Sequence, residues 1–148
     1  MTMLPEQIRT KRIYEKASRA DGTRVLVDRL WPRGVSKEQA TLHAWLKDLA
    51  PSDELRKWFH QHPESWPMFR KQYCKELRQT HAAAGLTELY RLASQRKRLT
   101  LLFASKDELH NNAVVLKELL EGIRKPPTGT GPAGLRFMKE SQAKRMPA

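Results

Sequence analysis

Two short polar stretches of this sequence carry the residue types that bind anions and transfer protons. They are "DRLWPRG", residues 28–34, and "SKDELHNN", residues 105–112. Guanidinium groups bind phosphate or carboxylate bidentately, an ammonium group adds a point charge, and imidazole titrates near neutral pH. A site for phosphate, carboxylate or a nucleotide is therefore expected. The residues expected to contact this ligand are Arg29, Trp31, Arg33, Ser105, Lys106, Asn111 and Asn112.

Each polar stretch follows an apolar segment that reads as a buried strand. The segments are "RVLVDRL", residues 24–30, and "LTLLFA", residues 99–104. The second is apolar on both faces, which is typical of a central parallel strand. Ligands of open α/β sheets bind beyond the carboxyl ends of the strands. If the two strands are parallel and adjacent, the two polar stretches converge at one edge of the sheet.

Asp28 and His110 are the candidates for proton transfer, should the site be catalytic. A structural interpretation of the same residues also stands. Asp28 could form an ion pair with Arg29 or Lys106, and Trp31 could cover the core. The residues around His110 are of types that cap the beginning of a helix. The sequence leaves both interpretations open.

Other kinds of chemistry lack the spacing that they require. The five histidines show no paired metal-ligand spacing, and the single cysteine, Cys74, offers no zinc set. We therefore expect no metal site, and no particular cofactor is indicated. The glycine-rich run "GTGPAG", residues 129–134, follows no predicted strand, so it is neither a dinucleotide fingerprint nor a P-loop.

The remaining elements predict an α/β fold with a small, mainly parallel sheet flanked by about five helices. Residues 8–14 could form a further strand, and Asp21-Gly22 predicts a tight turn before residues 24–30. Apolar spacings of three and four residues predict the helices. These are helices at 42–49, 53–60 and 65–82, one from Leu86 after a break at Gly85, and one ended by Gly122. Residues 1–123 are expected to form a single domain.

The charge of the chain lies mainly at its two ends. The formal net charge is +12, and residues 25–123 account for only +4 of it. Residues 124–148 are rich in basic residues, Pro and Gly, so we expect a disordered tail. Basic ends suggest an alternative function, in which the chain associates with nucleic acid without reading its sequence. No apolar leader is visible at the N-terminus, so we expect a cytoplasmic protein without a membrane partner.

Several long motifs resemble the YeaO-like family of uncharacterised bacterial proteins, also described as domain of unknown function 488. These motifs are "RVLVDRLWPRGVSK", "AWLKDLAPSDELRKWF", "HPESWPMFRKQY" and "LTLLFASKDELHNNAVVLKELL". The resemblance covers about residues 8–122 and leaves out the basic tail. It implies that the stretches 28–34 and 105–112 are signature blocks of the family. It implies no reaction and no catalytic residue.

Overall fold

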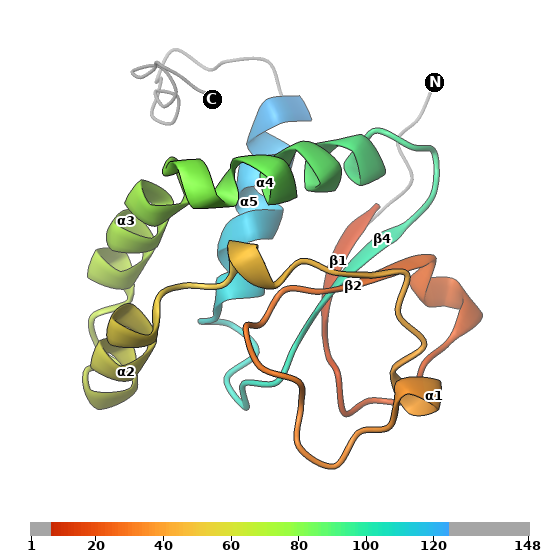
Figure 1. Ribbon diagram of the computed structural model, residues 1–148, viewed down its shortest axis with the longest axis horizontal. Coiled ribbons are helices and arrows are strands. Elements are labelled where there is room, and N and C mark those ends of the chain that lie inside the picture. The colour runs from red at the N-terminus through yellow and green to blue at the C-terminus, as the bar shows by residue number, and fades with distance from the viewer. Residues whose placement is uncertain (1–6, 125–148) are drawn as a thin grey trace.

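The computed structural model describes residues 7–124, which form a four-stranded parallel sheet with helices on one face and shorter segments on the other (Figure 1). The strands are β1 (Ile8–Arg12), β2 (Thr23–Leu26), β3 (Ala44–Trp45) and β4 (Leu99–Phe103). Their order in the sheet is β1-β4-β2-β3. The predicted α/β class is confirmed, and so is the parallel pairing of the two apolar strands, with Val25 opposite Leu101.

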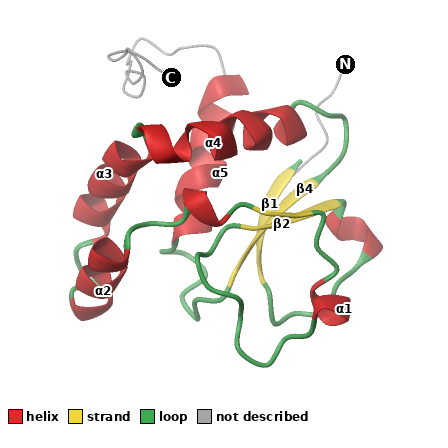
Figure 2. Cartoon of the chain, viewed as in Figure 1, coloured by secondary structure: helices red, strands yellow, loops and turns green. Residues whose placement is uncertain are grey.

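Five α-helices and two short 3-10 helices complete the fold (Figure 2). The α-helices are α1 (Lys37–Ala40), α2 (Asp53–Gln61), α3 (Trp66–Leu77), α4 (Thr80–Ala93) and α5 (Asn112–Arg124). The 3-10 helices are η1 (Arg19–Asp21) and η2 (Lys47–Leu49). Side-chain caps begin the helices next to the site: Ser52 accepts a hydrogen bond from the backbone of Leu55 in α2. None of the described helices is long and apolar enough to cross a bilayer.

Alternation along the strands divides the core between the two faces of the sheet. Val25 and Leu101 belong to the larger core, which α2, α3, α4 and α5 cover. Leu26 and Leu102 belong to a smaller core on the opposite face, beneath α1 and the neighbouring loops. Because adjacent strand residues point to opposite faces, the apolar strands β2 and β4 supply both cores at once.

A buried ion cluster lies at the side of the smaller core. Asp21 is fully buried, and its carboxylate accepts bonds from Lys11 at 3.0 Å and from Arg24 at 2.6 Å. Burial raises the pKa of Asp21, but the hydrogen bonds from Lys11, the Ser18 backbone and Arg24 outweigh it, so the net pKa is lowered. The side chain of Arg24 also donates to the carbonyl of Ala40. The cluster therefore joins β1, η1, β2 and α1.

The predicted helix at 42–49 is wrong, because this segment crosses the edge of the sheet instead. Ala44 and Trp45 pair with β2, and the backbone N–H of Leu46 donates to the carbonyl of Leu26 at 2.9 Å. Trp45 then packs against the smaller core, whereas Leu49 belongs to the larger one. The apolar residues of this segment serve the cores on both faces of the sheet, and their spacing of three and four residues happens to equal that of an amphipathic helix.

Other predicted boundaries also shift. The strand expected at 24–30 ends at Leu26, and the predicted break at Gly85 lies inside α4. A Cβ at Gly85 would lie 3.0 Å from the Leu49 side chain, so close packing of α4 on η2 explains this glycine. Gly122 does not end α5, which continues to Arg124. The tail expected to be disordered lies outside the described residues.

Candidate functional site

Asp28 lies where the ends of β2 and β4 meet the first turn of α5. Its Oδ2 accepts a hydrogen bond from the backbone N–H of Ala104 at 2.9 Å, and its Oδ1 accepts one from Asn112 Nδ2 at 3.1 Å. The same Asn112 nitrogen donates to the carbonyl of Val27 at 2.9 Å. The two predicted polar stretches therefore come into direct contact through Asp28 and Asn112.

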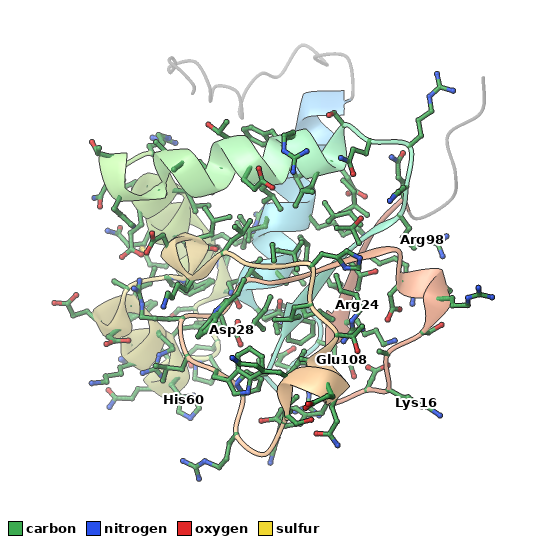
Figure 3. The ribbon with its side chains drawn as sticks, turned by 45° about the vertical axis from the view of Figure 1, so that its right-hand side comes forward. Lys16, Arg24, Asp28, His60, Arg98 and Glu108 are labelled. Carbon is green, nitrogen blue, oxygen red and sulfur yellow. The ribbon has the colours of Figure 1, made fainter. Side chains whose placement is uncertain are left out.

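Burial raises the pKa of the Asp28 carboxyl above its usual value of 3.8. The hydrogen bonds from Ala104 and Asn112 and the positive charge of Arg56 act in the opposite direction but do not cancel the effect of burial. Arg56 belongs to α2, so this helix faces the carboxylate from the side of the larger core. Figure 3 shows Asp28 inside the fold, among side chains of several elements.

The other residues of the first polar stretch point in different directions. Arg29 Nη2 makes two long contacts, 3.4 Å to the carbonyl of Ala50 and 3.5 Å to that of Pro51. Its guanidinium group therefore lies beside the start of α2 rather than beside the stretch 105–112. Trp31 donates its indole N–H to the carbonyl of Val35 at 2.6 Å and packs against the smaller core.

Arg33 and Lys106 are the exposed cations of the predicted site. Neither side chain forms a hydrogen bond or an ion pair within residues 7–124. The carbonyl of Arg33 accepts a bond from the Tyr14 hydroxyl at 3.1 Å, which fixes this loop beside the loop that follows β1. Both cations are thus available to a ligand, but the structure does not bring them into contact with Asp28.

Most side-chain hydrogen bonds of the second polar stretch, residues 105–112, are formed within that stretch. Asp107 Oδ1 accepts the backbone N–H groups of Leu109 and His110, both at 3.0 Å, and Oδ2 lies 3.3 Å from His110 Nδ1. Burial raises the pKa of Asp107, but these two backbone bonds and His110 outweigh it and lower the net pKa. The ring of His110 packs 4.9 Å from that of Trp66 in α3. His110 is therefore positioned by both an acid and an aromatic ring.

Ser105 and Asn111 shape the same loop. The hydroxyl oxygen of Ser105 accepts the backbone N–H of Asp107 at 3.1 Å. Asn111 Oδ1 accepts the N–H of Val114 at 3.1 Å, as expected of a residue that caps the start of α5. Asn111 also donates to the carbonyl of Asp107 at 2.9 Å. These two residues order the loop that carries Lys106 and His110.

The sequence reasoning missed three residues beside this edge. Arg12 donates to the carbonyls of Ser105 at 2.8 Å and Ala104 at 2.9 Å, and its guanidinium lies 5.0 Å from the ring centre of Tyr14. Arg56 and Trp66 approach from α2 and α3. Arg12 is the last residue of β1, so the rule about strand ends accounts for its position, but the strand predicted at 8–14 extended two residues beyond it. Arg56 and Trp66 carry no comparable signal, because they reach the edge only through helix packing.

Comparison with known proteins identifies relatives over the whole described fold. A family model described as the inactive DUF488-N3 subclade matches residues 7–127. The uncharacterized protein YeaO of Escherichia coli (strain K12) is 44% identical over 118 residues, which cover 78% of this chain and 98% of that protein. The uncharacterized protein Rv3073c of Mycobacterium tuberculosis (strain ATCC 25618 / H37Rv) is 41% identical over 116 residues, covering 78% and 95%. No solved structure matches significantly. The predicted resemblance is confirmed, and the chain belongs to the YeaO-like DUF488 family, within its inactive DUF488-N3 subclade.

Proposed function

We propose that this domain is a cytoplasmic binding module for a small anionic, nucleotide-like ligand at the carboxyl edge of its sheet. The observation that carries this proposal is the half-buried carboxylate of Asp28, held between β2, β4 and the start of α5. Each oxygen of Asp28 accepts one protein hydrogen bond. A carboxylate oxygen can accept two, so each retains capacity for a hydroxyl or amino group of a ligand.

Cations of the stretches 28–34 and 105–112 offer contacts to an anionic group. Arg29 makes only long contacts of 3.4 and 3.5 Å, so a phosphate would offer its guanidinium stronger, charge-assisted bonds. Arg33 and Lys106 are exposed on the adjacent loops. In this account Asp28 selects the hydrogen-bond donors of the ligand, while Arg29, Arg33 and Lys106 bind its negative charge.

The contacts of Asp28 and His110 agree better with ligand binding alone than with acid–base catalysis. The imidazole of His110 lies 3.3 Å from Asp107 and packs on Trp66. The carboxylate of Asp28 is fastened by Ala104 and Asn112. The description of the matching subclade as inactive supports the same interpretation. Asp28 and His110 are therefore proposed as ligand contacts, and no cofactor is assigned.

A ligand panel followed by thermal unfolding tests this function. Inorganic phosphate, a nucleoside monophosphate and the uncharged nucleoside are each added to the full chain. A ligand that binds only the native state raises the melting temperature, and the shift grows with the logarithm of its concentration relative to its Kd. We expect the nucleotide to give the largest shift and Arg33→Ala to reduce it. Lys71→Ala, on the exposed face of α3, is the matched control and should preserve the shift. No shift with any compound would contradict the proposal.

A second candidate function is association with nucleic acid through the basic terminal segments. The course of α5, the helix that precedes the C-terminal segment, favours it. α5 begins beside Asp28 at the carboxyl edge and extends over 13 residues, about 20 Å. It therefore ends near the opposite edge, where β1 begins (Figure 1). Salt-sensitive binding to nucleic acid should weaken when residues 125–148 are removed, and unchanged binding would exclude a role for them.

A further inference from the structure

We infer that the amino edge of the sheet is a binding surface for the phosphate backbone of double-stranded nucleic acid, built from Arg19, Arg96 and Lys97. We call these three residues the basic edge. It lies at the end of the sheet opposite Asp28, so it does not rest on the proposed small ligand. It also differs from the second candidate function above, because Arg96 and Lys97 lie outside both terminal segments and Arg19 lies in the folded helix η1.

Hydrogen bonds hold the two parts of the basic edge beside each other. Arg96 and Lys97 lie in the segment that joins α4 to β4, and Arg19 lies in η1. The carbonyl of Arg98 accepts the backbone N–H of Thr23 at 2.8 Å, and Arg98 Nη1 donates to the carbonyl of Ala20 at 3.2 Å. η1 is therefore held against the segment that carries Arg96 and Lys97. Figure 3 shows Arg98 extending from this end of the molecule.

Close backbone packing makes this arrangement rigid. Gly22 follows η1 with a φ of +66°, and a Cβ at this position would lie 2.2 Å from the carbonyl oxygen of Arg98. Only glycine allows the two backbone segments to approach so closely. Cations on a rigid scaffold lose less conformational entropy when they bind an extended polyanion. The basic edge is thus prearranged before a partner arrives.

The positive charge of the basic edge is not neutralised by its neighbours. The acid of η1, Asp21, is fully buried and already paired with Lys11 and Arg24. Arg19, Arg96 and Lys97 are all exposed, and none of them forms an ion pair or side-chain hydrogen bond within the described part of the chain. Residues 94–99 contain no acid. A positive potential at this edge therefore extends into solvent.

The sequence that follows α5 adds further positive charge to the chain. α5 ends at Arg124, and residues 124–148 carry six basic residues and one acid. Exposed charges of opposite sign attract one another over about 10 Å at 0.1 M salt. The basic edge provides defined contacts, and the charge of residues 124–148 adds to the general attraction between the chain and a polyanion.

The composition of the basic edge favours a duplex over a membrane or a single strand. The large apolar side chains exposed in the described residues are Tyr14, Leu30, Met68 and Leu109. None of them belongs to the basic edge or to the segment 94–98. Apolar groups that insert strengthen binding to a membrane surface, and aromatic rings that stack on bases strengthen binding to a single strand; the basic edge offers neither. Cations alone bind phosphates and do not read sequence.

Fluorescence anisotropy with the full-length chain tests this inference. The probe is a labelled DNA duplex of about 20 base pairs, titrated at several salt concentrations around 0.1 M. The test variant is Arg19→Ser/Arg96→Ser/Lys97→Ser. The control variant, Lys57→Ser/Lys71→Ser/Lys75→Ser, removes the same charge from exposed positions of α2 and α3. We expect the test variant to bind at least about tenfold more weakly and to lower the salt slope by roughly 2 to 3. The control should change both quantities by much less.

Four outcomes overturn the inference. Equal loss in the two triple variants would mean that only net charge matters, and absence of binding by the wild type would remove the partner. Full loss in a Lys139→Gln/Lys144→Gln/Arg145→Gln variant, with the basic edge variant unaffected, would assign binding to the terminal segment. Tighter binding to a single strand or to anionic vesicles than to the duplex would name a different partner. Circular dichroism of each variant establishes that it is folded.

Discussion

Asp28 is the central residue of the proposed ligand site and also holds three elements of the fold together. The carboxylate ends one strand, accepts the first N–H after another, and is held by the first residue of α5. Because burial raises its pKa above 3.8, the charged form is less stable in the native state than in the unfolded chain. If Asp28 only held these elements together, a neutral side chain at this position would avoid the cost of burying a charge.

Replacing Asp28 by Asn tests this balance. An amide can accept only through one atom, so one of the two bonds from Ala104 and Asn112 is lost, at a cost of about 1–3 kcal/mol. The contribution of Asp28 is fully present below pH 3.8 and is lost as the pH rises through its raised native pKa. The wild type minus Asp28→Asn difference in unfolding free energy should therefore fall from acidic to neutral pH. Urea titrations of both proteins measure it, and a difference that grows with pH contradicts the assignment.

Asp21 is the residue on which the buried ion cluster depends. Asp21→Asn leaves Lys11 and Arg24 buried with no counter-charge, which should cost about 3–5 kcal/mol of unfolding free energy. Asp53→Asn is the control, because Asp53 is 59% exposed and lies 3.7 Å from the exposed Arg56. Loss of that surface pair should cost at most about 1 kcal/mol. Urea unfolding at neutral pH compares the two, and equal losses would contradict the role given to the cluster.

At the scale of elements, one glycine allows η1 and the start of β4 to pack together. Gly22→Ala combines a left-handed φ of +66° with a Cβ only 2.2 Å from a backbone oxygen, and should cost about 3 kcal/mol or more. Gly34→Ala is the matched comparison: its φ is +80°, but nothing lies within 4 Å of the added Cβ. It should cost only about 1–2 kcal/mol.

Thermal and urea unfolding of the two glycine variants separates the clash from the backbone strain. Similar losses in both would mean that conformation alone matters and that η1 can move away from Arg98. A much larger loss in Gly22→Ala would support the rigid contact on which the basic edge depends. Gly34→Ala also tests whether the loop that carries Arg33 tolerates the change.

The elements show which kinds of signal the sequence carries. The apolar strand β4 and its parallel pairing with β2 were predictable, because a short run that is apolar on both faces fits only a central strand. The edge strand β3 was not, since its two residues gain their conformation from pairing with β2, and their apolar spacing equals that of a helix. At the site, the meeting of the stretches that contain Asp28 and Asn112 was predictable, because both stretches follow adjacent parallel strands. The approach of Arg56 and Trp66 was not predictable, because it depends on how α2 and α3 pack.

At the scale of the whole molecule, the two ends of the parallel sheet carry different surfaces. The carboxyl edge presents Asp28 among loops with mixed charges, and the amino edge presents Arg19, Arg96 and Lys97. A parallel sheet makes this separation possible because all its strands begin at one edge and end at the other. One surface can thus bind a small ligand while the other binds a polyanion.

The net charge of +12 predicts how the stability of the molecule depends on salt. Repulsion between like charges destabilises the compact state, and salt screens it. The melting temperature should therefore rise when sodium chloride increases from about 0.01 M to 0.15 M, as the screening length shortens from about 30 to 8 Å. Differential scanning calorimetry measures the shift. A fall over this range would mean that favourable ion pairs, such as Arg70–Glu118 at 2.6 Å, dominate instead.

The most direct measurement of the central claim is a nitrogen–proton NMR titration of the full chain with a nucleoside monophosphate. The backbone N–H of Ala104 donates to Asp28, so its resonance reports on the carboxylate itself. With ligand added to about 10 mM, tenfold above a millimolar Kd, we predict shifts of Ala104, of the Asn112 side-chain amide and of residues 28–34. These shifts should disappear in Asp28→Asn. Spectra that do not change, or changes confined to other parts of the fold, would contradict a ligand site at the carboxyl edge.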